Sequence, residues 1–226
     1  MSTFRLNYSS WPGIAWSMGA ILCVAVLATV SLATAESLKP LDLPPPQTDG
    51  GRPFMEVLKE RASARQFSPE KLPLQVLSNL LWAAFGINRP EEGKRTAPSA
   101  RNWQEIDIYV AMAEGLYLYQ PKPHALKPVL PEDIRPATGR QAFVRDAPVN
   151  LVYVADYSKM SGASNEERDF YAAASTGHIS QNVYLYCASE RLATVVRGMV
   201  DRVTLSKLMK LRPDQKITLA QTVGYP

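Results

Sequence analysis

Several residue types that signal a particular chemistry are scarce in this chain of 226 residues. It contains two histidines, His124 and His178, and two cysteines, Cys23 and Cys187. A structural zinc site needs a cluster of Cys and His ligands, so no metal site is expected. The sequence also lacks a G-x-G-x-x-G, a Walker and a G-x-S-x-G pattern. These absences argue against a nucleotide-binding motif of those kinds and against a hydrolase nucleophile elbow.

Charge is modest in amount and scattered along the chain. The 25 Lys and Arg residues against 21 Asp and Glu residues give a formal net charge of +4. No dense basic run is interleaved with aromatic residues, so we do not expect nucleic-acid binding. Hydrophobic residues make up 46% and charged residues 20% of the chain. This composition and length suit one sizeable domain with its own core.

The first 35 residues differ in composition from the rest. Arg5 precedes a run without charge from Leu6 to Ala35, which ends in Ala33-Thr34-Ala35. A basic start, an apolar core and an A-x-A site are typical of a secretory signal peptide. We expect residues 1–35 to be a cleaved Sec-type signal peptide, which places the mature protein in the periplasm or otherwise outside the cytoplasm. The alternative is an uncleaved membrane anchor, because the uncharged run is long enough to span a bilayer.

The rest of the chain divides into a short Pro- and Gly-rich segment and one domain. Residues 36–53 are expected to be a linker or arm. Residues 54–226 alternate between helical and strand patterns with at least one hairpin, so the predicted class is α+β. Residues 89–101 and 121–136 are expected to be irregular. The periodicities predict helices near 54–63, 73–86, 169–189 and 205–211, and strands near 106–113, 116–119, 149–157, 192–196 and 217–223.

An R-x-S-x-R pattern follows the first predicted helix. Arg61, Ser63 and Arg65 place two guanidinium groups and a hydroxyl within one short segment. Arginine offers forked donors that suit a phosphate, so the three side chains are candidates for binding one anion. The alternative is an ordinary solvated helix end, where cations favour the helix dipole.

A second polar pattern precedes the first long predicted strand. The segment reads Pro98-Ser99-Ala100-Arg101-Asn102-Trp103-Gln104. Hydroxyl and amide groups provide both donors and acceptors, which can read the edge of a heterocycle. The alternative is a turn that is rich in Ser and Asn.

Taken in order, these elements resemble the nitroreductase superfamily. In that family an R-x-S-x-R element holds the phosphate of FMN, and a P-S-[SA]-x-N-x-Q element contacts the flavin. The resemblance therefore implies that Arg61, Ser63, Arg65, Pro98, Ser99, Ala100, Asn102 and Gln104 bind FMN. The helix at 177–182 and the ending Val223-Gly224-Tyr225-Pro226 are also similar to family elements. The segments 116–119, 124–126 and 147–148 are closest to the SagB/ThcOx-like dehydrogenase branch.

The resemblance further implies an antiparallel-rich sheet flanked by helices in an intertwined homodimer. FMN would lie at the dimer interface and transfer hydride through flavin N5 to or from a small conjugated substrate, such as a nitroaromatic, a quinone or an azoline-like compound. No catalytic side chain is then required, because the flavin performs the redox chemistry. NAD(P)H is a possible electron donor. The loop residues Val196, Arg197 and Gly198 would meet the flavin ring through the backbone. The alternative is a non-catalytic flavin- or ligand-binding protein that retains this fold, since Val-Val-Arg replaces the residues usual in that loop.

Overall fold

The computed structural model describes residue 1, residue 3 and residues 37–226. Apart from residues 1 and 3, the predicted signal peptide lies outside the described residues. Among those residues, no helix is long and apolar enough to cross a membrane. The helices are α1 (Phe54–Glu60), α2 (Leu74–Phe85), α3 (Asn165–Ser189) and α4 (Arg202–Leu208), and the strands are β1 (Leu41–Asp42), β2 (Ile87–Arg89), β3 (Lys94–Arg95), β4 (Ile106–Met112), β5 (Gly115–Gln120), β6 (Ala125–Leu130), β7 (Val149–Asp156), β8 (Ala193–Arg197) and β9 (Gln215–Gly224).

A mixed arrangement of helices and an antiparallel sheet confirms the predicted α+β class. Seven of the described strands form one sheet in the order β1-β6-β5-β4-β7-β9-β8, and β2 pairs with β3 separately. Every pairing is antiparallel. The hairpin predicted around Glu114 is present, with Met112 opposite Gly115. β7 lies between β4 and β9, and all its residues are buried, as its apolar run predicted.

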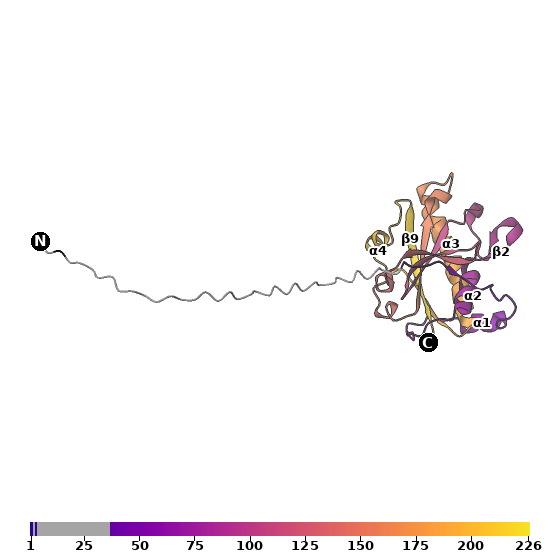
Figure 1. Cartoon of the computed structure of the whole chain (residues 1–226). Helices are drawn as coiled ribbons and strands as arrows, with labels where there is room; N and C mark the ends of the chain where they lie inside the picture. The colour runs from indigo at the N-terminus through magenta and orange to yellow at the C-terminus, as the bar shows by residue number, and fades with distance from the viewer. Residues whose placement is uncertain (2, 4–36) are drawn as a thin grey trace. The chain divides into compact units, whose positions relative to one another are not determined.

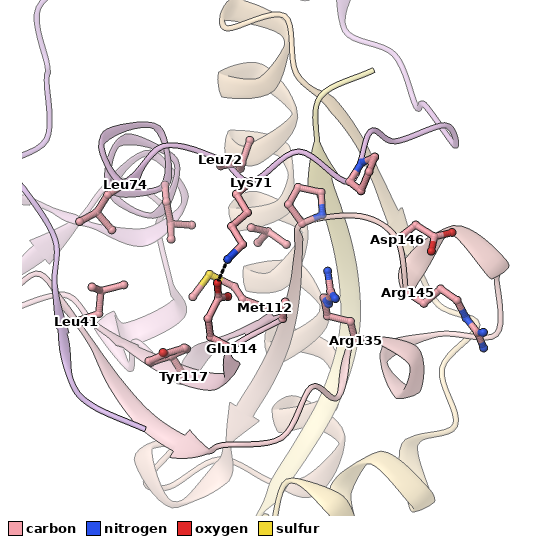
Figure 2. A pocket seen from close by; sticks show the side chains of 15 residues that line it. Leu41, Lys71, Leu72, Leu74, Met112, Glu114, Tyr117, Arg135, Arg145 and Asp146 are labelled. Carbon is pink, nitrogen blue, oxygen red and sulfur yellow. Dashed lines mark hydrogen bonds and ion pairs between the residues drawn. The ribbon is translucent and has the colours of Figure 1, made fainter. Parts of the chain in front are cut away.

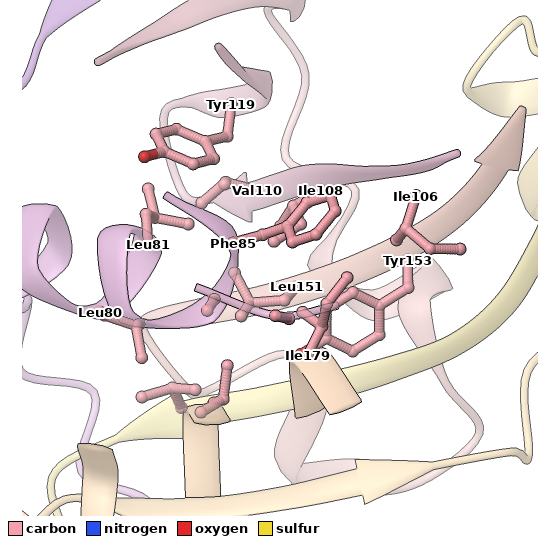
Figure 3. Close-up of a cluster of buried hydrophobic side chains, with 14 of the residues drawn as sticks. Leu80, Leu81, Phe85, Ile106, Ile108, Val110, Tyr119, Leu151, Tyr153 and Ile179 are labelled. Carbon is pink, nitrogen blue, oxygen red and sulfur yellow. The ribbon is translucent and has the colours of Figure 1, made fainter. Parts of the chain in front are cut away.

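Helices cover both faces of the sheet, with α2 and α3 on one side and α4 on the other (Figure 1). The side chains of β4 alternate between these faces, since Ile108 and Val110 join the core under α2 and α3, whereas Tyr109 and Ala111 join the core under α4. Figure 3 shows part of the first core, to which α2 contributes Leu80, Leu81 and Phe85, the strands contribute Ile108, Val110 and Leu151, and α3 contributes Ile179. This packing fixes where each end of α3 lies relative to the strands.

The long helix α3 begins earlier than its apolar pattern predicted. Ser164 and Glu167 form a reciprocal capping box, in which the Ser164 hydroxyl accepts from Glu167 N–H and the Glu167 carboxylate accepts from Ser164 N–H. This cap satisfies backbone donors at the helix start, and the helix therefore begins at Asn165. α4 also begins before its predicted start, because Asp201 caps it by accepting from Thr204 N–H.

Two segments that were expected to be irregular contain strands. Residues 121–136 include β6, which pairs with both β5 and β1. The prolines suggested otherwise, but Pro128 lies beyond the residues that pair with the short β1. A proline is tolerated at such an edge because no ladder hydrogen bond is lost. Residues 89–101 include β3 and the end of β2, which form a small separate hairpin.

The Pro- and Gly-rich segment lies against the domain as an arm over its described residues, 37–53. Leu41 pairs with Leu126 of β6, and Leu43 is buried. Farther along, Gln47 N–H donates to Asn79 Oδ1 of α2 at 2.8 Å. The arm is therefore held by both a strand pairing and side-chain contacts.

Candidate functional site

The predicted anion-binding segment follows the end of α1 and runs beside the edge strand β8. Arg61 N–H donates to Val57 O at the helix end, and Ala64 N–H donates to Thr194 O at 2.9 Å. The pairing with Thr194 fixes the segment against β8. The structure thus places Arg61, Ser63 and Arg65 along one edge of the sheet.

The two arginines of this segment have no acidic partner among the described residues. The Arg61 guanidinium lies 5.2 Å from the centre of the Tyr184 ring, in a cation–π contact. Arg65 is exposed. Because neither charge is neutralised by a carboxylate of the described chain, both are available to an anion such as a phosphate.

Tyr184 of α3 joins the anion-binding segment to the loop at the end of β8. Its hydroxyl is 2.7 Å from Ser63 Oγ, and it accepts from Val196 N–H at 3.0 Å. The ring is almost fully buried at 7% exposure, so the hydroxyl position is fixed by packing. Sequence reasoning missed this residue, because a tyrosine on a helix carries no signal for which strand it will meet.

The loop after β8 presents free backbone donors. Gly198 and Met199 are exposed. No hydrogen bond is formed by the N–H group of either residue among the described residues. An exposed loop with two unpaired donors can bind acceptor atoms of a planar ring. Predicted site residues Val196 and Gly198 are thereby brought close to the Ser63 segment through Tyr184.

The side chain of Arg197 points into the protein instead of toward this open loop. Its guanidinium donates to Thr138 O at 2.7 Å, Asn150 Oδ1 at 3.0 Å and Thr222 Oγ1 at 3.1 Å. Burial lowers its pKa to about 10. Arg197 therefore holds the loop in place, and only its backbone faces the candidate site.

The predicted flavin-contact segment 98–104 forms a tightly bonded loop. Ser99 Oγ accepts from Gln104 N–H at 3.0 Å. The Gln104 side chain accepts from Arg95 Nε at 2.7 Å and donates to Gly93 O and to Asn102 Oδ1, at 2.8 and 2.9 Å. These bonds fix the loop on the β2–β3 hairpin. The polar side chains of Gln104 and Asn102 are thus partly used to shape the loop.

Unusual backbone geometry marks the same loop. Arg101, Asn102 and Gln104 have φ values of 49°, 55° and 50°. Positive φ is uncommon in residues other than glycine and costs free energy, and such strain gathers at functional sites. Pro98, which opens the segment, is exposed, and Ala100 is half-buried. The loop therefore presents a rigid surface to solvent.

Within one chain, the anion-binding segment 61–65 and the flavin-contact segment 98–104 lie far apart. Trp103 packs edge-on against Tyr171 near the start of α3, with ring centres 5.8 Å apart. Ser63 instead contacts Tyr184, near the end of the same helix. At 1.5 Å per residue, these two positions are about 20 Å apart along the helix axis.

Metal ligands, the cysteine and a separate cavity are the remaining features that could mark a functional site. The described residues include no group of three His, Cys, Asp or Glu side chains placed to hold a metal. Cys187 is fully buried, and burial raises the pKa of its thiol, so it is the structural thiol that its apolar helix predicted.

A cavity of about 560 Å³ lies between α2 and the β4–β5 turn, with a Lys71–Glu114 ion pair among its lining residues (Figure 2). None of the predicted cofactor-binding residues lines it.

Comparisons with known proteins identify relatives over most of the chain. The sequence model described as the nitroreductase family matches residues 58–225. A Methanocaldococcus jannaschii protein that carries the nitroreductase name is 31% identical over 167 residues, which cover 70% of this chain and 84% of the relative. The structure of a Ralstonia eutropha protein described as a nitroreductase is 43% identical, has a TM-score of 0.80 and covers 86% of this chain and 91% of its own. The Vibrio harveyi NADPH:FMN oxidoreductase, solved with NAD+, has the same fold at 18% identity and a TM-score of 0.59, over 76% of this chain and 68% of its own.

Proposed function

The chain belongs to the nitroreductase family and is an FMN-dependent oxidoreductase, and we propose that it moves hydride to or from a small conjugated substrate. A nitroaromatic, a quinone or an azoline-like compound has the required chemistry. Flavin N5 supplies the hydride chemistry when FMN is bound. The observation that carries the proposal is the pair of exposed N–H groups at Gly198 and Met199, which have no hydrogen-bond partner among the described residues. They follow Val196, whose N–H donates to the Tyr184 hydroxyl. The same hydroxyl contacts Ser63, in the segment whose two arginines have no carboxylate partner among the described residues.

The phosphate of FMN fits the Arg61–Arg65 segment. A phosphate dianion needs several donors and positive charge, and this segment offers two guanidinium groups and the Ser63 hydroxyl. Ser63 can bond to the phosphate while it keeps its contact with Tyr184, because a hydroxyl both donates and accepts. We assign Arg61, Ser63 and Arg65 to phosphate binding.

The ring of FMN fits the loop after β8. The free N–H of Gly198 is a donor suited to a ring nitrogen, and it requires no side chain. Val196 is held by the Tyr184 hydroxyl, and Arg197 is anchored in the interior, so the loop is fixed before the ligand arrives. Such preorganisation avoids an ordering cost on binding.

A homodimer would complete the site, and we propose that this is the active form. The exposed face of α3 carries Phe170, which is 67% exposed, followed by the small residues Ala173, Ala174 and Gly177. The neighbouring α1 exposes Met55 at 73%. Exposed apolar side chains beside small residues are typical of an interface. A second copy in antiparallel orientation across α3 would bring its 98–104 loop to the Arg61–Arg65 segment.

The flavin assignment is tested by FMN titration. Protein mixed with FMN should show a visible flavin spectrum that remains after gel filtration. Arg65→Ala should weaken FMN binding by about 1.5–3 kcal/mol, since one charge-assisted hydrogen bond is lost. Lys59→Ala is the matched control, because Lys59 is an exposed cation in the last turn of α1. Failure to bind FMN at micromolar protein would overturn the assignment, and equal loss in both variants would remove Arg65 from the site.

We further propose that the protein is exported and that NAD(P)H reduces the flavin. The uncharged segment after Arg5 and the A-x-A sequence support export. An N-terminal sequence that begins at Glu36 in protein recovered from the periplasm would agree with it, and an intact Met1 would not. The name of the Vibrio harveyi neighbour supports a nicotinamide donor. Turnover of a quinone with NADPH or NADH tests this directly.

A further inference from the structure

A basic groove lies between α4 and the first residues of β9. Its volume is about 680 Å³, which is within the usual range for small-ligand sites. Its lining includes five cations and, among the described residues, no Asp or Glu. The cations are Arg202, Lys207, Lys210, Arg212 and Lys216.

The five cations differ in how far they are already neutralised. Arg212 pairs with Asp156 at 2.8 Å and with Asp214 at 3.1 Å. Lys216 lies 3.7 Å from a carboxylate oxygen of α3. Lys207 and Lys210 form no ion pair or hydrogen bond through their side chains within the described part of the chain. Two positive charges in the groove are therefore available to an anionic ligand.

Apolar side chains lie beside these free charges. Val203, on the first turn of α4, is 68% exposed, and Met199 just before α4 is 59% exposed. Leu211, Pro213 and Ile217 also line the groove. Apolar surface next to unpaired cations suits a ligand with a flat, weakly polar ring and phosphate groups.

The groove adjoins the candidate flavin loop. The Arg202 guanidinium donates to Gly198 O at 3.2 Å and to Ile217 O and Thr218 O at 3.0 and 2.6 Å. Arg202 thus lines the groove and contacts the loop that presents the free backbone donors. The Cα atoms of Gly198 and Arg202 are no more than about 15 Å apart, since four residues separate them. One end of the groove therefore lies beside the candidate flavin loop.

We propose that the groove binds the adenosine end of NADPH, with Lys207 and Lys210 contacting its 2′- and 5′-phosphates. The inference rests on the proposed function for the identity of the electron donor. Lysine ammonium groups bind phosphates as point charges, and the 2′-phosphate is the group that NADH lacks. The groove therefore makes the protein prefer NADPH over NADH. The exposed apolar side chain of Val203 provides a surface for the adenine ring.

Calorimetric titration of the purified chain with 2′,5′-ADP and with 5′-AMP tests the groove directly. The bisphosphate should bind at least tenfold more tightly than the monophosphate. A double variant, Lys207→Glu with Lys210→Glu, should lose at least tenfold in 2′,5′-ADP affinity, and the milder Gln pair should lose less. Lys127→Glu is the control, because Lys127 is an exposed cation on β6. Equal affinity for the two nucleotides, or equal affinity in wild type and both double variants, would overturn the proposal.

The same titration separates this inference from the proposed function. Binding of 2′,5′-ADP needs no flavin, so it is measured with and without FMN. Protein that binds 2′,5′-ADP but no FMN would retain the groove and refute the flavin assignment. Protein that binds FMN but discriminates neither nucleotide would refute the groove alone. In FMN-loaded protein, the Glu pair should raise the KM for NADPH at least tenfold and the KM for NADH by a smaller factor, because NADH keeps the 5′-phosphate and lacks only the 2′-phosphate.

Discussion

Replacing Tyr184 with phenylalanine should separate the two elements that we assign to FMN. The substitution removes only the hydroxyl, so the buried ring and its packing on α3 remain. The hydroxyl contacts Ser63 Oγ at 2.7 Å and accepts from Val196 N–H at 3.0 Å. Without it, the phosphate segment and the end of β8 lose the one side chain that bonds to both among the described residues.

The expected size of the effect follows from these two hydrogen bonds. Each contributes about 1 kcal/mol net, so Tyr184→Phe should lower the free energy of unfolding by about 2 kcal/mol. For a domain of this size, 1 kcal/mol shifts Tm by roughly 2–4 °C, which predicts a decrease of about 4–8 °C. FMN affinity should fall as well, because Ser63 is no longer held in position.

Tyr186→Phe is the matched control on the same helix. Its hydroxyl donates to Val76 O at 3.2 Å and also interacts with the Asn79 side chain, away from the candidate site. This variant should lose about 1 kcal/mol and bind FMN as the wild type does. Thermal unfolding and FMN titration of both variants provide the comparison. If Tyr184→Phe is no less stable than Tyr186→Phe, or if it binds FMN equally well, Tyr184 does not couple the two elements.

Three further predictions concern stability and are checked by urea unfolding. Leu80→Ala should lower the free energy of unfolding by about 2–5 kcal/mol, because Leu80 is fully buried in the core under α2. A decrease below about 1 kcal/mol would contradict this packing. Lys71→Ala should cost less than about 1 kcal/mol, since the Lys71–Glu114 pair is largely exposed, and a larger loss would mean that the pair supports the cavity beside it. Burial lowers the pKa of His124, so the folded state favours its neutral form. The free energy of unfolding should therefore have its full His124 contribution above about pH 6.5, the ordinary pKa of histidine. It should decrease as the pH drops from there toward the lowered pKa of the folded state. His124→Gln should remove that part of the pH dependence, and an unchanged pH profile would refute it.

Local sequence patterns predicted the elements that depend on local rules. The apolar face from Leu74 to Phe85 predicted α2, and the continuous apolar run at Val149 predicted the central strand. These predictions succeeded because hydrophobic periodicity records which face of an element is buried. The predicted starts of α3 and α4 were less accurate, since the caps at Ser164 and Asp201 lie outside the apolar pattern.

The candidate site shows the same division between local and long-range information. The residue types at Arg61, Ser63 and Arg65, together with their spacing, made this segment a candidate for anion binding, with a solvated helix end as the alternative. The part of Tyr184 in the site, by contrast, depends on the packing of α3 against β8. The inward direction of Arg197 depends on contacts with Thr138 and with residues of β7 and β9.

Residue types and their spacing were sufficient to specify the fold class, most of the helices and strands and the polar character of the two candidate binding segments. The three-dimensional packing was needed to establish that 61–65 and 196–198 meet, that 98–104 lies at the other end of α3, and that a basic groove adjoins Gly198. This division arises because residue types and periodicity act over a few neighbours. Contacts between distant segments are instead set by sheet register and helix packing, which depend on the whole core at once.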